Sequence, residues 1–144
     1  MYQRIDTYAV NPKAVNLLAS ASKHTSSIDK KLKALVELRI SQINGCVYCV
    51  DLHSREARAE GENQKRLDSL AVWHESILFN EAERAAFTWA EALTHVSITH
   101  APDAVFEELK KHYSEQQIVD LTLIISMMNM WNRLAVGMRR LPDE

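Results

Sequence analysis

Residues 32–53 read LKALVELRISQINGCVYCVDLH and carry the strongest structural signals in the chain. Apolar residues recur here at the three- and four-residue spacing of a helix: Leu32, Leu35, Val36, Ile40 and Ile43. Asn44-Gly45 then predicts the end of that helix, because glycine readily takes the left-handed conformation in which helices stop. We expect this helix to begin at Ser27 and the next one to begin at or near Cys46.

The rest of the chain carries similar helix signals. It contains only three Gly and three Pro, too few for the many turns of an all-β fold. The helices expected from capping residues and apolar spacing cover residues 12–24, 27–44, 46–61, 63–73, 80–93, a short stretch around 105–109, and 114–137. The sequence therefore predicts an all-α fold, a compact domain of six or seven helices spanning residues 1–144.

Length and composition narrow the class of protein. A chain of 144 residues with 47% apolar residues has enough side chains for one hydrophobic core. The formal charge of −2 provides no basic surface, so neither a nucleic-acid partner nor a membrane partner is expected. The apolar stretch 118–131 is interrupted by Asp120 and Asn129 and is shorter than the ~20 residues of a membrane span. The first residues lack the apolar core of a signal peptide, so we expect a cytoplasmic protein.

The chemistry of the chain is concentrated at Cys46, Cys49 and His53. Two cysteines are too few for a disulfide framework, and only two residues separate them. On a helix these three side chains fall within about 60° of one another, so they share one face. The two sulfurs are then close enough to form a disulfide, and the imidazole lies one helical turn beyond Cys49.

A helix start also favours the thiolate form of cysteine. The unpaired N–H groups and the positive end of the helix dipole lower the pKa of a nearby thiol and make it reactive. The dipole favours Cys46 as the reactive sulfur, whereas the neighbouring imidazole favours Cys49. These residue patterns by themselves leave the choice between the two sulfurs open.

The cysteine pair allows two other interpretations. Cys46, Cys49 and His53 would supply three ligands of a zinc site, but closure needs a fourth ligand from elsewhere in the chain. The cysteines could also be inert core residues, because free cysteine packs as a small hydrophobic side chain. Haem attachment requires His directly after the second cysteine, where this chain has Val50. Redox chemistry is the interpretation that uses all three residues.

The stretch Ser41-Gln-Ile-Asn-Gly-Cys-Val-Tyr-Cys49, followed by His53 and Ala57, resembles the alkylhydroperoxidase D branch of the carboxymuconolactone decarboxylase superfamily. Weaker similarity continues through three further stretches: residues 60–67, 90–94 and 129–133. The decarboxylase branch is a poorer match, because it does not rely on a C-x-x-C pair.

The resemblance implies an all-helical fold, assembly into trimers or hexamers, and a cysteine peroxidase or disulfide-reductase activity without a bound cofactor. In the family scheme Cys49 attacks the hydroperoxide and becomes a sulfenic acid, and Cys46 condenses with it to a disulfide. An external dithiol or thioredoxin-like donor then reduces that disulfide, and His53 serves in the proton relay that activates Cys49.

The chain departs from this pattern at one position. The peroxidases carry a relay Glu twelve residues before the first cysteine, where this chain has Ala34. Glu37 follows one turn later on the same helix, so it is the candidate to replace the missing carboxylate. The alternative is that Glu37 is a solvated surface charge, in which case disulfide exchange could survive without fast peroxidase turnover.

The remaining expectations concern assembly and partners. The last helix is apolar nearly all round, which predicts a contact with a second copy of the chain, and Trp131 is expected near the cysteines if this helix crosses them. Arg39 falls among apolar positions and should find a carboxylate partner.

The leading hypothesis is a hydroperoxide-reducing enzyme with catalytic Cys46, Cys49, His53 and Glu37. The alternatives are a protein disulfide reductase and a non-enzymatic redox-sensing or binding oligomer.

Overall fold

The computed structural model describes residues 1–143. Within them the chain forms α-helices and short 3-10 helices and contains no strand. The α-helices are α1 (Thr7–Val10), α2 (Pro12–Ser20), α3 (Lys30–Asn44), α4 (Val47–Ala59), α5 (Gln64–Ser69), α6 (Glu81–Thr94), α7 (Val96–Thr99), α8 (Asp103–Lys110) and α9 (Glu115–Met138), and the 3-10 helices are η1 (Ala21–His24) and η2 (Leu70–Glu75). The predicted all-α class is confirmed.

The predicted number of helices, six or seven, is wrong, because the described residues contain nine α-helices. The two that were not expected, α1 and α7, have four residues each, which is too short to show apolar periodicity. The expected start at Ser27 is also wrong. The helix begins at Lys30 with Asp29 as its cap, and Ser27 instead donates two hydrogen bonds to Asp120 on α9.

Several helix ends lie where the capping residues predicted them. Asn80 and Ser114 each form a capping box at the start of α6 and α9. Gly45 ends α3 in the left-handed conformation, with φ of 66°. The reversal at Gly45 directs the chain straight into α4, so the start of α4 is held close to the end of α3.

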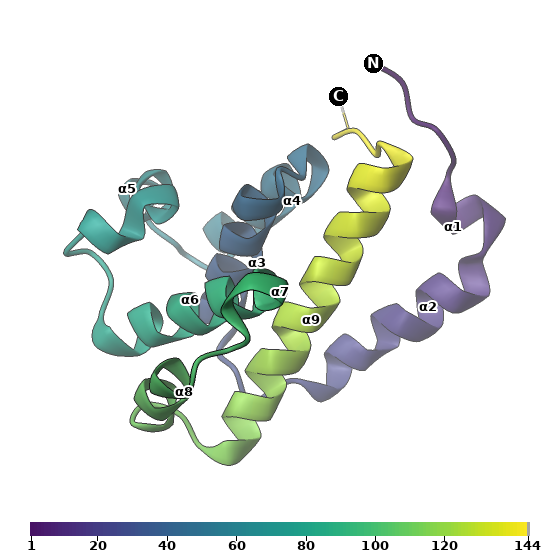
Figure 1. The fold of residues 1–144 in the computed structure, drawn as a ribbon. Helices are drawn as coiled ribbons and strands as arrows, with labels where there is room; N and C mark the ends of the chain where they lie inside the picture. Colours follow the sequence, from purple (N-terminus) through teal and green to yellow (C-terminus); the bar gives the residue numbers. More distant parts are fainter. Residues whose placement is uncertain (144) are drawn as a thin grey trace.

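Helix α3 is the centre of the core. It packs against α4, α9 and α6, while α6 also packs against α8 and α9 (Figure 1). The side chains that fill the space between these helices are almost completely buried: Leu35, Leu38, Ile40, Leu70, Phe87, Leu109, Leu121 and Ile125. The centre of the molecule therefore holds α3 and α4 in a fixed relation, and the candidate site lies on these two helices.

A group of polar side chains, in which Ser41, Asn129 and Asn132 are buried and Asn44 is exposed, ties the end of α3 to α9. The Asn44 amide donates to the side-chain oxygens of Asn129 and Asn132, each at 2.9 Å. Asn132 donates in turn to Ser41 at 3.1 Å, and Asn129 donates to Thr94 on α6 at 3.1 Å. Buried amides are costly without partners, so this group fixes the register of three helices. It also gives Ser41 and Asn44 of the resemblance motif a structural role.

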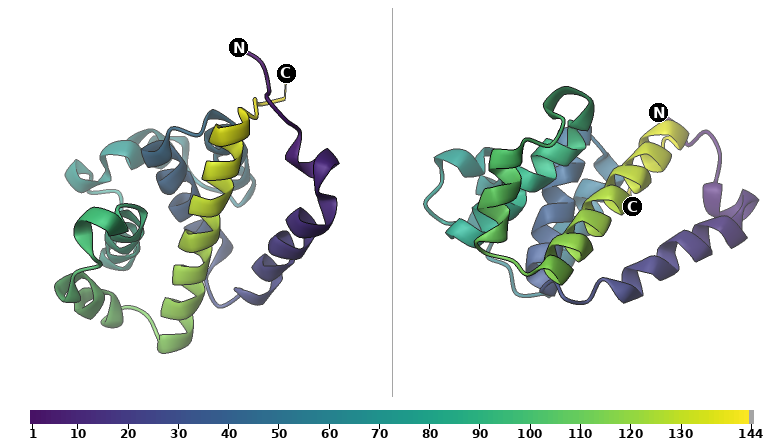
Figure 2. Two further views of the ribbon diagram at one scale, coloured as in Figure 1. Left: turned by 45° about the vertical axis from the view of Figure 1, so that its right-hand side comes forward. Right: turned by 60° about the horizontal axis from the view of Figure 1, so that its bottom comes forward.

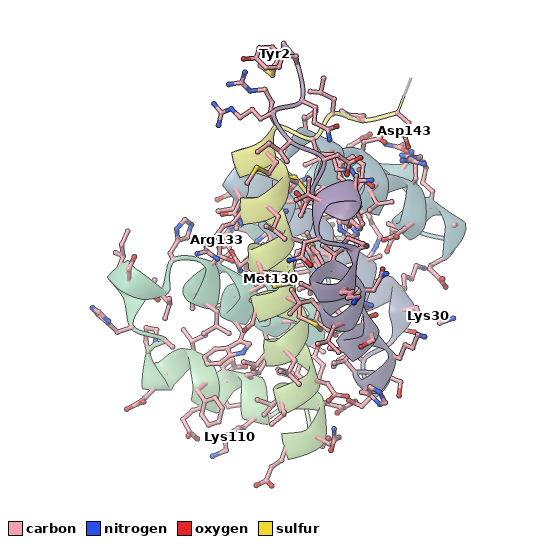
Figure 3. The ribbon with its side chains drawn as sticks, turned by 90° about the vertical axis from the view of Figure 1, so that its right-hand side faces the viewer. Tyr2, Lys30, Lys110, Met130, Arg133 and Asp143 are labelled. Atoms are coloured by element: carbon pink, nitrogen blue, oxygen red, sulfur yellow. A yellow bond between two sulfur atoms is a disulfide. The ribbon has the colours of Figure 1, made fainter. Side chains whose placement is uncertain are left out.

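Helices α1 and α2 form an arm that extends away from the other helices (Figure 2). Its one buried residue is Val15, and Leu17 on its surface is 74% exposed. The start of the chain is tied to the end of α9, because Arg4 donates to the carbonyl oxygens of Gly137 and Met138. Figure 3 looks onto this arm and shows Tyr2 near the C-terminal end of α9. The arm therefore closes one side of a space against α9.

The carboxylate partner that was predicted for Arg39 is present in the fold. Arg39 finds the predicted carboxylate in Glu91, whose Oε1 accepts hydrogen bonds from Arg39 at 2.7 Å and from Trp73 at 2.9 Å. In the part of the chain that the structure describes, no helix combines the length and the apolar character that crossing a membrane requires.

Candidate active site

Cys46 and Cys49 form a disulfide at the N-terminus of α4. Cys46 is the residue that caps the helix, and its sulfur accepts a hydrogen bond from the Cys49 N–H at 3.3 Å. The two residues are 2% and 3% exposed. The expected helix start and the expected pairing are both confirmed, and the sulfurs lie in the field of the α4 N-terminus.

His53 lies one turn further along α4 and contacts two carboxylates. Its Nδ1 atom is 2.7 Å from Oε2 of Glu56 and 3.4 Å from Oε2 of Glu37. Glu56 belongs to the same helix, whereas Glu37 reaches the imidazole from α3. Because both carboxylates contact Nδ1, the other ring nitrogen, Nε2, is available to exchange a proton with another group.

The two carboxylates have opposite electrostatic surroundings. Burial raises the pKa of Glu37, although the charges of His53 and Lys33 oppose the shift. A hydrogen bond from His53 lowers the pKa of Glu56, which is half-exposed. The pKa values of these two neighbouring carboxyl groups are therefore shifted in opposite directions. Glu56 thus holds the negative charge beside the imidazole, and Glu37 binds a proton more readily.

A cavity of about 270 Å³ opens beside Cys49, between the arm on one side and α3, α4 and α9 on the other. We call it the Cys49 cavity. The polar groups on its wall include Glu37, His53, Glu56 and Arg140, and its apolar wall includes Trp131 and Leu134. Trp131 therefore lies where the sequence expectation placed it. The disulfide can be reached by a small organic molecule from this side.

Cys46 lines a second hollow of about 340 Å³. Its lining includes Arg4, Arg139 and Arg140. Each cysteine of the pair thus lines a different hollow. Arg140 is shared by both hollows, because it lines the Cys49 cavity as well.

The described residues also contain one arrangement able to hold a metal ion. Glu37, His53 and Glu56 place ligand atoms within 4.8 Å of one another. The three groups contact one another directly, because His53 is hydrogen-bonded to Glu56 at 2.7 Å and forms an ion-pair contact with Glu37 at 3.4 Å. The zinc site considered from the sequence needs both thiolates, and in the disulfide state the cysteine pair offers neither.

The structure brings all four candidate residues to one place, since Cys46 is bonded to Cys49, and Cys49, His53 and Glu37 line one cavity. The alternative of Glu37 as a solvated surface charge is wrong, because its side chain is 15% exposed and contacts the imidazole. Sequence reasoning missed Glu56, although its position three residues after His53 on one helix was a usable signal. It also missed Arg140, which no sequence pattern links to Cys49.

Comparison with known proteins shows what the chain is similar to. Residues 11–92 match the carboxymuconolactone decarboxylase family. The uncharacterized protein YdfG of Bacillus subtilis is 36% identical over 140 residues, which cover 96% of this chain and 95% of that protein.

Solved structures extend the comparison to the whole fold. A protein of unknown function from Agrobacterium tumefaciens, provisionally named an antioxidant defence protein AhpD, is 36% identical with a TM-score of 0.95, covering 99% of each chain. The debrominase Bmp8 is 28% identical with a TM-score of 0.82, covering 95% of this chain and 75% of Bmp8. A cysteine-to-alanine variant of Bmp8 in complex with 2,3,4-tribromopyrrole is 27% identical, with a TM-score of 0.83 and coverage of 95% and 74%.

Proposed function

This chain belongs to the carboxymuconolactone decarboxylase family, and we propose that it is a thiol-dependent peroxidase that reduces organic hydroperoxides. One observation carries the proposal: the Cys46–Cys49 disulfide borders a cavity whose wall also holds His53. A dithiol that closes to a disulfide beside an acid–base group is the equipment that two-electron reduction of a peroxide needs. The provisional naming of a 36% identical protein for antioxidant defence supports the same activity.

The reaction runs in three balanced steps. The Cys49 thiolate attacks one oxygen of ROOH, the O–O bond breaks, and the products are a Cys49 sulfenic acid and ROH after protonation of the alkoxide. The Cys46 thiol then displaces water from the sulfenic acid, which forms the disulfide. An external dithiol reduces the disulfide by exchange and leaves as its own disulfide. The sum is ROOH plus dithiol giving ROH, water and the oxidised donor.

His53 moves the proton in the first step. It accepts the proton of the Cys49 thiol and returns a proton to the departing alkoxide. Glu56, 2.7 Å from Nδ1, stabilises the charged imidazole while it holds that proton. Glu37, whose pKa is raised by burial, contacts the same imidazole from the α3 side and helps to orient it during this transfer.

The test is stopped-flow hydroperoxide consumption by the reduced protein with a supplied dithiol. Turnover is expected for the native chain and is lost in both Cys46→Ser and Cys49→Ser. A sulfenic acid is trapped after one peroxide addition in Cys46→Ser and not in Cys49→Ser. The reverse trapping result would exchange the roles of the two cysteines. The protein could instead consume no peroxide and still use the dithiol to reduce other disulfides. That result would show that it is a disulfide reductase and not a peroxidase.

Reductive dehalogenation is a second candidate, favoured by the likeness to the debrominase Bmp8. Here the Cys49 thiolate takes bromine from an aromatic ring, and the ring carbanion takes a proton from His53. The Cys46 thiolate then displaces bromide, and the same disulfide forms. Bromide release from 2,3,4-tribromopyrrole without hydroperoxide turnover would favour this function, and hydroperoxide turnover without bromide release would exclude it.

We also propose that the chain works as a homo-oligomer, a trimer or a hexamer. The residues on one stripe of α9 share a solvent-facing position: Val119, Leu123, Ser126, Met130 and Arg133. Val119 and Leu123 are 55% and 46% exposed, and Figure 3 labels Met130 and Arg133 of the same stripe. A second copy would cover these apolar side chains. If oligomer size follows the redox state while no substrate is turned over, the redox-sensing alternative holds instead.

A further inference from the structure

Arg140 is the feature of the Cys49 cavity that the peroxidase chemistry leaves unexplained. Two cations line this cavity, and Lys33 is paired with Glu37 at 3.9 Å. Arg140 has no carboxylate partner and donates no side-chain hydrogen bond among residues 1–143, although it is partly buried. Its main chain is anchored, because its N–H donates to the Ala135 carbonyl oxygen at 2.8 Å. The guanidinium therefore lies on the cavity wall, and no side chain of residues 1–143 accepts a hydrogen bond from it.

Two tyrosines hold this guanidinium in place. Its central carbon lies 4.1 Å from the ring centroid of Tyr48 and 4.6 Å from that of Tyr8. Contact with aromatic rings orients a guanidinium and removes part of its water, while the N–H groups at its edge stay available. A carboxylate can accept two parallel hydrogen bonds from such an edge. This edge can therefore bind an anion, on a cavity wall that also carries the carboxylates of Asp6, Glu37 and Glu56.

The position of Arg140 relates it to the reacting sulfur. Tyr48, which it contacts, directly precedes Cys49 on α4, whereas His53 and Glu56 follow Cys49 along the same helix. At about 1.5 Å per residue, His53 lies roughly 7 Å further along the helix axis than Tyr48. Arg140 therefore contacts α4 at the residue before Cys49, whereas the acid–base group follows Cys49 along the same helix.

The size and the apolar lining of the cavity indicate what kind of molecule carries the anionic group. Its volume of about 270 Å³ is several times the ~30 Å³ that a water-sized molecule occupies. Leu52, Trp131 and Leu134 give it an apolar wall. Hydrogen peroxide would leave most of this space empty and Arg140 unused. A molecule with an apolar body and one anionic group would occupy both.

We propose that Arg140 binds the carboxylate of the substrate, and that the substrate is a small aryl or alkyl hydroperoxide carrying a carboxylate. The substrate class rests on the proposed peroxidase function, whereas the anion site rests on the cavity alone. The carboxylate lies against Arg140 and Tyr48, the apolar body lies against Trp131, and the peroxide oxygen faces Cys49.

Binding without reaction tests the anion site. The ligands are 4-isopropylbenzoate and its neutral isostere 4-isopropylbenzamide, titrated into the full chain by calorimetry. The native protein should bind the carboxylate about tenfold more tightly than the amide, as a charge-assisted hydrogen-bond pair predicts. Arg140→Gln should bind the two ligands about equally. Arg139→Gln is the matched control and should keep the preference, because Arg139 does not line the Cys49 cavity.

A second variant separates recognition from folding. Arg140→Lys keeps the charge but loses the paired donors, so it should keep part of the preference, and thermal melting checks that each variant is folded. Equal affinity of the native protein for the two ligands would overturn the proposal. A preference that persists in folded Arg140→Gln would overturn it as well.

Kinetics then tests the substrate class. The KM for the 4-carboxylate of cumene hydroperoxide should rise about tenfold in Arg140→Gln, while the KM for its 4-carboxamide stays within about twofold. If neither hydroperoxide is consumed but the binding preference depends on Arg140, the peroxidase proposal fails and the anion site stands. If both are consumed with equal KM by the native protein, the peroxidase stands and the carboxylate specificity fails.

Discussion

Nδ1 of His53 on α4 lies 3.4 Å from Oε2 of Glu37 on α3, so two helices together build one acid–base cluster. Ala34, at the position where the family's relay carboxylate is expected, is 4% exposed and lies in the core. Glu37, one turn later, supplies a carboxylate to the same imidazole. The cluster therefore contains a carboxylate from α3 even though the expected position has none, and its part in catalysis can be tested directly.

Glu37→Gln should lower hydroperoxide turnover by roughly 10- to 100-fold, within the range of general acid–base contributions. The raised pKa of Glu37 should also shape the acidic limb of the rate profile, so this limb should change in the variant. The measurement is kcat against pH by stopped flow. Glu60→Gln, an exposed change just after α4, is the matched control and should retain the native profile. If Glu37→Gln turns over hydroperoxide at the native rate, Glu37 does not take part in the proton relay.

The same substitution should make the protein more stable at neutral pH. The folded-state pKa of Glu37 is raised from 4.5, so the folded protein binds this proton more tightly than the unfolded chain. The stability that this group contributes is present at low pH and is lost as the pH rises from about 4.5 through the folded pKa. Melting temperatures of native protein and Glu37→Gln, measured across pH 4 to 8, should diverge in favour of the variant. A lower melting temperature at pH 7 would contradict this.

Glu56→Gln should have the opposite pH dependence. Its hydrogen bond with His53 lowers the folded-state pKa of Glu56 below 4.5. The resulting stability is present above pH 4.5 and is lost as the pH falls through the folded pKa. The variant should therefore melt below the native protein at pH 7 and converge with it in acid. Because the side chain is 48% exposed, the difference should be modest, and a difference that grows in acid would refute it.

Asn44→Ala should reduce the free energy of unfolding by roughly 1–3 kcal/mol, because two hydrogen bonds are lost at an exposed residue. The substitution leaves the side-chain oxygens of Asn129 and Asn132 without the donor that reaches both of them. Urea denaturation measures the loss. Asn16→Ala, at an exposed position of α2, is the control and should change stability by less than about 0.5 kcal/mol. Equal effects of the two substitutions would show that this group of amides contributes little.

Leu123→Glu should shift the proposed oligomer toward smaller species, because it places a charge beside the exposed apolar side chain of Val119 on α9. Light scattering after size-exclusion chromatography gives the mass of each species. Val72→Glu changes a residue of similar exposure on η2 and should leave the mass unchanged. If the native protein is a monomer, the oligomer proposal is wrong. If Leu123→Glu has the same mass as the native oligomer, the interface does not include this part of α9.

Features that depend on near neighbours in the chain were predictable. The Gly45 stop, the capping boxes at Asn80 and Ser114, and the start of α4 follow from side chains within about one turn of the helix end. The start of α3 was placed three residues early because Ser27 has the side chain of a cap. Its hydroxyl instead donates to Asp120, a residue on a different helix. Contact with Asp120, which is far away in the sequence, therefore determines that Ser27 does not cap the helix and that Asp29 does.

The placement of Cys46, Cys49 and His53 on one face follows from the sequence, because hydrogen bonds along the helix backbone set the angle between residues three and four apart. The contact of Glu37 with His53, and of Arg140 with Tyr48, depends on how α3 and the end of α9 pack against α4. That packing follows from the burial of the whole core and from the Asn44 amide group, which no short stretch of sequence contains. The sulfurs and the imidazole are thus a local property of one helix. The second carboxylate and the guanidinium beside them are a property of the folded chain.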